Sequence, residues 1–310
     1  MKSAINQFFF RPYSDNKSLA FFRIGLAVIL FSQMLSIWSD FLTIYGENGL
    51  IRGDVANVYT SPLQITIHHI TDWMTSLFGS TEIANLLALR YVYMILLVFL
   101  ALGLFTRFSA FFLWLLHLAF VKAAYYLSYG VDYMHTFMLF YCIIFPVGNQ
   151  FSLDAYLFKF KFKNPLPYLR LVQLHLCVIY FFGGMGKALG ENWWNGESIW
   201  KSINRPMESS FSFDWMAEYS WIPMILGIGV VFMELLYPVA MWLKPVGKYW
   251  LWAITSMHVG IAIFLDLTFF GATMIMLNMT GFYFFYGQMK EEKTITYKVK
   301  TPEISLQIAS

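Results

Sequence analysis

The most constraining feature of this sequence is a series of apolar runs, each close to the length of a helix that crosses a bilayer. A hydrocarbon core about 30 Å thick needs roughly 20 helical residues per crossing. Eight runs fit this description, and four of them are short: residues 19–38, 84–104, 109–127, 134–150, 170–184, 222–243, 249–265 and 268–286. They lack the alternation of outer-membrane strands. The runs therefore predict an all-α polytopic membrane protein with about eight transmembrane helices.

The composition points to the same class. Only 13% of the 310 residues are charged, whereas soluble domains carry about 25%. The aromatic content of 20% exceeds what a water-soluble core needs and suits a chain surrounded by membrane lipid. The basic residues form no stripe, so we expect no nucleic-acid partner. Cys142 and Cys177 both lie in apolar runs, so we expect no disulfide framework.

The distribution of basic residues predicts the topology. If the N-terminus is cytoplasmic and eight spans alternate, fourteen basic residues fall on the cytoplasmic side: Lys2, Arg11, Lys17, Arg107, Lys159, Lys161, Lys163, Arg170, Lys244, Lys248, Lys290, Lys293, Lys298 and Lys300. Four fall outside: Arg52, Lys187, Lys201 and Arg205. This bias predicts an N-in/C-in topology. We expect no cleavable signal peptide.

The predicted spans divide the chain into one membrane domain and two short ends. Residues 1–18 form a cytoplasmic N-terminal segment, and residues 19–286 form a single transmembrane domain. Its long external loops, about 39–83 and 185–221, are expected to be partly structured, and the first holds an amphipathic stretch over 55–78 that could lie in the interface. Residues 287–310 form a cytoplasmic tail, with a short strand pair or a loose segment around TITYKVK.

Four charged side chains fall within the predicted spans, where a charge near the bilayer centre costs at least about 2.5–3.5 kcal/mol. Arg23, Arg90 and Lys122 are near span ends and can snorkel, although Arg90 can instead face the bundle. Glu234 is deeper. It is either part of a structural ion pair, a neutral acid, or a group that handles protons. The six histidines form no metal-binding motif, so we expect no metal site.

The segment YFFGGMGKALGENWWNGESIW, residues 180–200, is the most informative in the chain. Its apolar helix ends in three glycines, and Lys187 follows at the predicted external boundary of the membrane. Desolvation by the neighbouring Trp193 and Trp194 would favour a neutral amine, which can act as a base. The alternative is a cation that merely anchors the helix end at the interface.

Several segments, taken in order, resemble the vitamin K-dependent γ-carboxylases and their bacterial relatives, the horizontally transferred transmembrane domain (HTTM) family. The pattern G-G-x-x-K, followed by Trp and N-G-x-S, resembles the region of the carboxylases' active-site lysine. Four further segments carry the resemblance over most of residues 18–285: FFRIGLAVILF, RYVYMILLVFLALGLFTRFSAFFLWLLHL, DYMHTFMLFYCIIFP and SMHVGIAIFLDLTFFGATMIML.

The resemblance implies roles for individual residues. In the carboxylases, a lysine deprotonates a hydroquinone, which reacts with oxygen to generate a stronger base. Lys187 occupies the position of that lysine, and His258 that of a histidine in a late span. The resemblance thus implies a reduced quinone as cofactor. One residue is inserted between Lys187 and Trp193 relative to the carboxylases, and only residues 287–310 follow the last span, so glutamate carboxylation itself is not implied.

Further polar residues are candidates for a proton network around this site. His135 lies near a second polar site of the family. His258 and Asp266 are eight residues apart, so they share a face if the helix is continuous. The candidate network comprises His135, His175, Glu234 and Asp266, and the expected ligand contacts are Gly184, Trp193 and Trp194.

Three functional hypotheses remain open from the sequence. The favoured one, which follows the resemblance to the bacterial relatives, is a bacterial-type enzyme or maturation factor of the inner membrane. It binds a quinone-like or other lipid-soluble ligand and modifies a secreted peptide or protein, with Lys187 as base and His258 as proton partner. The second is a non-catalytic scaffold or accessory subunit for a secreted peptide partner. The third is a transporter, although we find no inverted repeat.

Overall fold

The computed structural model describes residues 2–13, 17–47, 49–50, 64–159, 164–205 and 212–287, and its regular structure in these ranges is helical, without strands. Five segments are long and apolar enough to cross a membrane: α2 (Lys17–Ser36), α6 (Glu82–Leu102), α7 (Thr106–Ala123), α10 (Leu166–Ala188) and Thr268–Gly287, which contains α16 (Thr268–Asn278) and the π-helical η2 (Met279–Tyr283). The predicted all-helical membrane fold is therefore confirmed.

The other three predicted spans also coincide with helices. Two are shorter apolar helices, α8 (Gly130–Ile144) and α13 (Trp221–Leu235), and the third is α15 (Val246–Phe264). The expected span over 222–243 is interrupted after Leu235, and the short α14 (Tyr237–Ala240) follows. Pro238 explains the break, because its ring lacks an N–H to donate to the carbonyl four residues earlier and clashes with it.

The remaining helices are short and lie mostly between the apolar segments. The segment 39–83 contains α3 (Phe41–Tyr45) and α5 (Ile67–Phe78), and the segment 185–221 contains α11 (Glu191–Trp194), α12 (Glu197–Ile203) and the 3₁₀ helix η1 (Asp214–Ala217). Near the expected cytoplasmic side are α1 (Lys2–Phe10) and α9 (Leu153–Phe158). The first part of the amphipathic stretch, 55–63, and the expected strand pair beyond residue 287 lie outside the described residues.

The long helices are apolar on both their inner and their outer faces. On α6, Tyr93 and Leu97 are buried, whereas Ile95 is 53% exposed and Val98 is 43% exposed. A surface helix in water places polar residues on its outer face. Apolar side chains on the outer face are instead stable in contact with lipid, which agrees with the membrane-spanning lengths of these helices.

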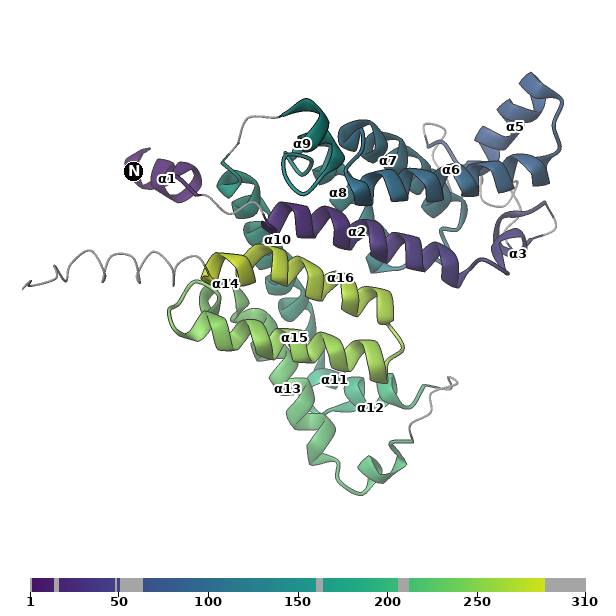
Figure 1. Ribbon diagram of the computed structural model, residues 1–310. Helices are drawn as coiled ribbons and strands as arrows, with labels where there is room; N and C mark the ends of the chain where they lie inside the picture. The colour runs from purple at the N-terminus through teal and green to yellow at the C-terminus, as the bar shows by residue number, and fades with distance from the viewer. Residues whose placement is uncertain are drawn as a thin grey trace, which may run out of the picture.

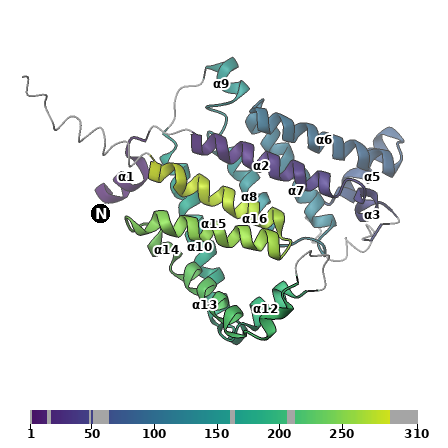
Figure 2. The same ribbon diagram turned by 60° about the horizontal axis from the view of Figure 1, so that its bottom comes forward.

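The helices pack so that distant parts of the chain become neighbours. In both views α2 lies between α6 and α16, and α15 lies on the other side of α16 (Figures 1 and 2). α7 packs against α8, and α10 packs against α13. The short α11 and α12 contact α13. As a result, α10, α13, α15 and α16 come together, and α11 and α12 cover one end of α13.

Two of the three arginine and lysine residues expected near span ends lie inside the bundle. Arg23 is completely buried, and its guanidinium donates to the carbonyls of Leu100 at 3.1 Å and Phe151 at 2.5 Å. Arg90 is also buried, stacks 3.6 Å from the ring centroid of Trp38 and donates to that residue's carbonyl. Snorkelling is therefore wrong for Arg23, and Arg90 takes the bundle-facing alternative. Backbone carbonyls accept hydrogen bonds from both guanidinium groups, and the face of Trp38 adds a cation–π contact to Arg90.

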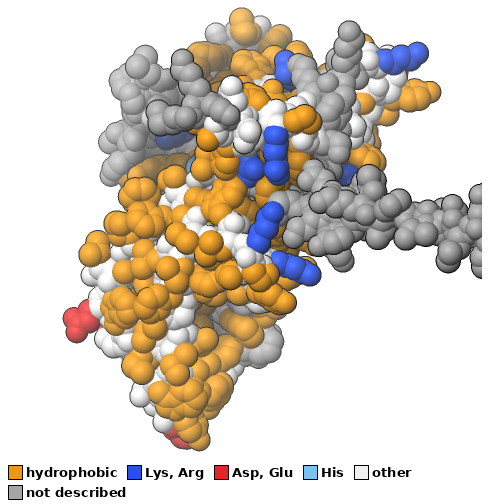
Figure 3. All heavy atoms as spheres, turned by 90° about the vertical axis from the view of Figure 1, so that its left-hand side faces the viewer, with side chains coloured by type: hydrophobic (Ala, Val, Ile, Leu, Met, Phe, Trp, Pro, Cys, Tyr) orange, Lys and Arg blue, Asp and Glu red, His pale blue; other side chains and the backbone are white. Residues whose placement is uncertain are grey.

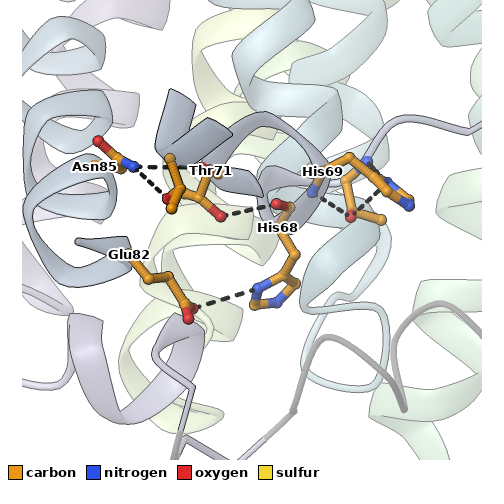
Figure 4. A network of polar contacts seen from close by, with 7 residues as sticks. His68, His69, Thr71, Glu82 and Asn85 are labelled. Atoms are coloured by element: carbon orange, nitrogen blue, oxygen red, sulfur yellow. Dashed lines mark hydrogen bonds and ion pairs between the residues drawn. The ribbon is translucent and has the colours of Figure 1, made fainter. Parts of the chain in front are cut away.

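The helix α5 is held by polar contacts at its start (Figure 4). Thr66 caps the helix: its hydroxyl accepts from the backbone N–H of His69, whose Nδ1 in turn accepts from the N–H of Thr66. This reciprocal arrangement satisfies two backbone donors. His68 points the other way, with Nδ1 4.0 Å from Glu82 Oε1. The two adjacent histidines thus serve different contacts and do not converge.

Candidate functional site

The helices α10, α13, α15 and α16, together with α11 and α12, line a cavity of about 590 Å³. Cavities of this size are typical of small-molecule sites, which combine apolar walls with a few polar groups. The lining is mainly aliphatic and aromatic, and its charged or titratable members are Tyr180, Lys187, Glu234 and His258. The two residues predicted as catalytic, Lys187 and His258, therefore lie in the same cavity although 71 positions separate them in the sequence.

Lys187 is in the last turn of α10 and Glu234 is in the last turn of α13. The Lys187 Nζ donates to Glu234 Oε2 at 2.6 Å, and the side chains are 25% and 10% exposed, respectively. Of the alternatives for Glu234, the structure thus contains the ion pair. In a partly dry site this pair is stronger than it would be on a surface, because fewer waters compete for either group.

Gly184 explains why these two side chains can meet. A Cβ atom added at this position would lie 2.7 Å from the backbone nitrogen of Leu235 and 2.9 Å from Glu234 Cβ. The missing side chain therefore lets α10 and α13 approach closely, as small residues do between membrane helices. Gly184 packs against α13 and does not line the cavity, whereas its neighbour Gly183 does. The residue predicted to touch a ligand thus serves helix packing.

His258 is on α15 and belongs to a buried chain of hydrogen bonds. Its Nε2 lies 2.7 Å from the hydroxyl of Tyr180, which accepts from Asn278 Nδ2 at 2.7 Å. Asn278 Oδ1 in turn accepts from the hydroxyl of Tyr237 at 2.7 Å. These four residues come from α15, α10, α16 and α14, and all are buried. The chain fixes the orientation of the His258 ring at the cavity wall.

The two neighbouring tryptophans have different positions. Trp193 lines the cavity, and Lys187 Nζ lies 5.3 Å from the centroid of its ring, within the range of a cation–π contact. Trp194 does not line the cavity. Its Nε1 donates to the carbonyl of Ala188 at 2.8 Å, and its ring makes an edge contact with Phe232. The structure therefore places only the first of these tryptophans at the cavity.

The remaining residues of the candidate proton network lie elsewhere. His135 is buried between α8 and α16, with Nε2 2.9 Å from Thr273 Oγ1. His175 is partly buried and hydrogen-bonds to the hydroxyl of Tyr141 through Nδ1 at 2.8 Å. Asp266 is exposed in the turn after α15, because that helix ends at Phe264 rather than continuing. None of these three lines the cavity, so they are separate from Lys187 and His258.

Three residues of the hydrogen-bond chain have no part in the sequence interpretation: Tyr180, Asn278 and Tyr237. They are recognisable only as isolated polar groups in apolar spans, which is a weak signal without a known partner. No group of three or more metal-binding side chains occurs among the described residues. Cys142 and Cys177 are free and buried.

A family model described as the HTTM domain matches residues 10–286. No curated protein and no solved structure matches the chain. The matched range includes every helix from α2 to η2 and every residue of the cavity. This multi-pass membrane protein therefore belongs to the HTTM domain family.

Proposed function

We propose that the protein is a membrane enzyme or maturation factor that binds a quinone-like or other lipid-soluble ligand in the Lys187 cavity and uses it to modify a secreted peptide or protein. The observation that carries this proposal is the convergence of Lys187, Glu234 and His258 on one cavity with apolar walls. Such a cavity excludes water from a basic group while admitting an apolar ligand.

The proposed topology places this cavity towards the external face. Eight spans in an inner membrane, with both ends in the cytoplasm, fit the charge bias and the eight helical segments. Figure 3 supports this orientation: Lys and Arg side chains gather on the face that carries α1 and the start of α2, whereas the acidic side chains in view lie apart from them, at the left margin and at the bottom end. Lys187 lies at the end of α10, remote from that basic face. A secreted partner could therefore reach Lys187 from the external side.

A reduced quinone fits the residues of the cavity. The volume of about 590 Å³ accommodates a substituted bicyclic ring, and the polar atoms of Lys187 and His258 are available to its oxygens. When bound, such a cofactor would supply an acidic hydroxyl group and two electrons. On the protein side, the Lys187 ammonium must first lose a proton to act as a base. Glu234, 2.6 Å away, is placed to accept that proton.

The test removes the basic nitrogen while keeping a hydrogen-bond donor next to Glu234. Lys187→Gln does this, and Lys201→Gln is its matched control, because Lys201 is 66% exposed and pairs with Glu197 on α12. Membrane vesicles are supplied with reduced 2,3-dimethyl-1,4-naphthoquinone in air, and its oxidation is followed by absorbance. We expect catalysed oxidation in the wild type and Lys201→Gln, and its loss in Lys187→Gln at a temperature at which all three proteins remain folded.

A second candidate, a non-catalytic scaffold for a secreted peptide, is favoured by the ion pair itself. A lysine held at 2.6 Å by a carboxylate also serves to join α10 to α13 without any chemistry. Wild-type protein that does not accelerate naphthoquinol oxidation, together with full activity of Lys187→Gln in any peptide-maturation phenotype, would favour the scaffold and contradict the catalytic proposal.

A further inference from the structure

The hydrogen-bond chain behind His258 fixes which of its ring nitrogens carries the proton. The chain consists of Tyr237, Asn278, Tyr180 and His258, joined by three contacts of 2.7 Å. The rings of Tyr180 and Tyr237 stack with their centroids 4.1 Å apart. Because all four side chains are buried, a donor or acceptor left without a partner is energetically unfavourable.

A backbone contact determines the orientation of the Asn278 amide. The atom assigned as Nδ2 lies 2.8 Å from the carbonyl oxygen of Met274, which can only accept a hydrogen bond. This atom must therefore be the nitrogen, and the other amide atom must be the oxygen. It follows that Tyr237 donates to Asn278 Oδ1 and that the Tyr180 oxygen accepts from Asn278 Nδ2.

The proton on the Tyr180 hydroxyl then has one acceptor in the described structure, His258 Nε2 at 2.7 Å. Nε2 is an acceptor only if it carries no proton, so the neutral ring carries its proton on Nδ1. A proton on Nε2 would face the Tyr180 oxygen instead and would leave the buried hydroxyl hydrogen without an acceptor. The chain thus selects the Nδ1–H form of His258.

The Nδ1 of His258 is itself buried, and it has no hydrogen-bond partner among the described residues. The ring belongs to the wall of the Lys187 cavity. We propose that His258 presents Nδ1–H as a neutral hydrogen-bond donor to an oxygen atom of the ligand that this cavity binds. The inference rests on the proposed function for the existence of a lipid-soluble ligand. It assigns His258 a positioning role and leaves proton removal to Lys187 and Glu234.

This role narrows the class of ligand. The ligand must offer an acceptor oxygen, such as a carbonyl, an ether or an ionised hydroxyl. A hydrocarbon of the same outline would fill the apolar volume but leave the Nδ1–H donor unsatisfied, and sites built around a buried donor discriminate strongly against such analogues. The cavity should therefore bind oxygenated rings in preference to the hydrocarbon chains of the surrounding lipid.

The tautomer is tested without any ligand. ¹⁵N-histidine-labelled protein in detergent at pH 7.5 gives nitrogen resonances that distinguish protonated from unprotonated ring nitrogens. The resonances of His258 are identified by their loss in His258→Gln, or by the shift that Tyr180→Phe causes if the first variant does not fold. We expect a proton on Nδ1 and none on Nε2. A proton on Nε2 would overturn the inference, whatever the activity of the protein.

The ligand preference is tested with two probes of matched outline, 2,3-dimethyl-1,4-naphthoquinone and 2,3-dimethylnaphthalene, competing against a radiolabelled naphthoquinone. We expect the wild type to prefer the oxygenated probe by about tenfold, the usual size of one hydrogen bond. His258→Phe, or His258→Leu, should lose this preference. Met257→Leu, a volume-conserving change in the same cavity wall, should retain it.

The two experiments test the tautomer of His258, its donor role and the class of ligand separately. A preference that survives in both His258 variants would overturn the donor role even with the proton on Nδ1. If the wild type binds neither probe, the quinone class of the proposed function fails together with the ligand part of this inference. The resonance measurement still decides the tautomer in that case, so the two failures are distinguishable.

Discussion

Gly184→Ala should separate α10 from α13 and weaken the whole cavity, although it adds a single methyl group. The new Cβ would lie 2.7 Å from the Leu235 nitrogen, 2.9 Å from Glu234 Cβ and 3.1 Å from the Glu234 carbonyl carbon. Two of these three atoms are backbone, so no side-chain rotation relieves the clash. Overpacking of this kind costs about 1–3 kcal/mol.

Gly186→Ala is the matched control, because it lies in the same turn of α10 and an added Cβ there meets nothing within 4 Å. Both variants gain up to about 1 kcal/mol of helix propensity, so their difference isolates the clash. At roughly 2–4 °C per kcal/mol, Gly184→Ala should melt about 2–12 °C below Gly186→Ala. The assay is thermal unfolding in detergent followed by size-exclusion chromatography. Equal melting temperatures for the two variants would refute the close packing inferred at this contact.

Three further sets of variants test the Lys187–Glu234 pair, the burial of His68 and the cap of α7. Lys187→Met and Glu234→Gln should each lower the free energy of unfolding, but the double variant should lower it by less than the sum of the two single effects. We expect a difference of about 1–2 kcal/mol, which is modest because the pair is partly exposed. Additive shifts of the melting temperature would contradict the ion pair. Burial lowers the pKa of His68 from its usual 6.5, with Asp72 opposing the shift. As the pH falls, the unfolded chain therefore binds a proton at His68 before the folded chain does, so the contribution of His68 to stability should be complete above pH 6.5 and should be lost as the pH drops below it. The melting temperature of His68→Gln should consequently fall less below pH 6.5 than that of the wild type. An equal fall in the two proteins would contradict this prediction. Asp154→Ala removes three hydrogen bonds to the start of α7 and should lower the free energy of unfolding by about 2 kcal/mol. Thermal unfolding measures this loss, with Glu191→Ala at an exposed carboxylate as the control. Equal stability of the two variants would rule out the capping role of Asp154.

The sequence predicts the helical segments well because a single physical requirement, a continuous apolar run of bilayer length, determines them. Each predicted span finds a helix, and the ends differ by a few residues, as for α10, which extends from 166 to 188 rather than from 170 to 184. The break after Leu235 also has a local cause in the sequence, because Pro238 disrupts the helical turn that precedes it.

The contacts between helices are less predictable, because nothing in a single sequence states which distant residues meet. Lys187 and Glu234 are each recognisable as costly charges, but their pairing across 47 positions depends on how α10 packs against α13. Arg23 illustrates the same limit: its partners are carbonyls 77 and 128 residues away, which have no sequence signature. Tyr180 and Asn278 become meaningful only beside His258. The motif thus predicts the position of the candidate site, but it does not predict the ion pair and the hydrogen bonds within it.

The pairing of Lys187 with Glu234 also bears on how the chain is assembled. Translation at about 5–20 residues per second separates the two residues by roughly 2–10 s. During that interval α10 has left the ribosome with a cation at its end and no acid to meet it. The neutral pair can form only when the later helix arrives, so this contact belongs to the association of helices that have already been inserted. On the proposed topology, α10 is therefore inserted with Lys187 among lipid headgroups and water, and Lys187 pairs with Glu234 only after α13 has been inserted.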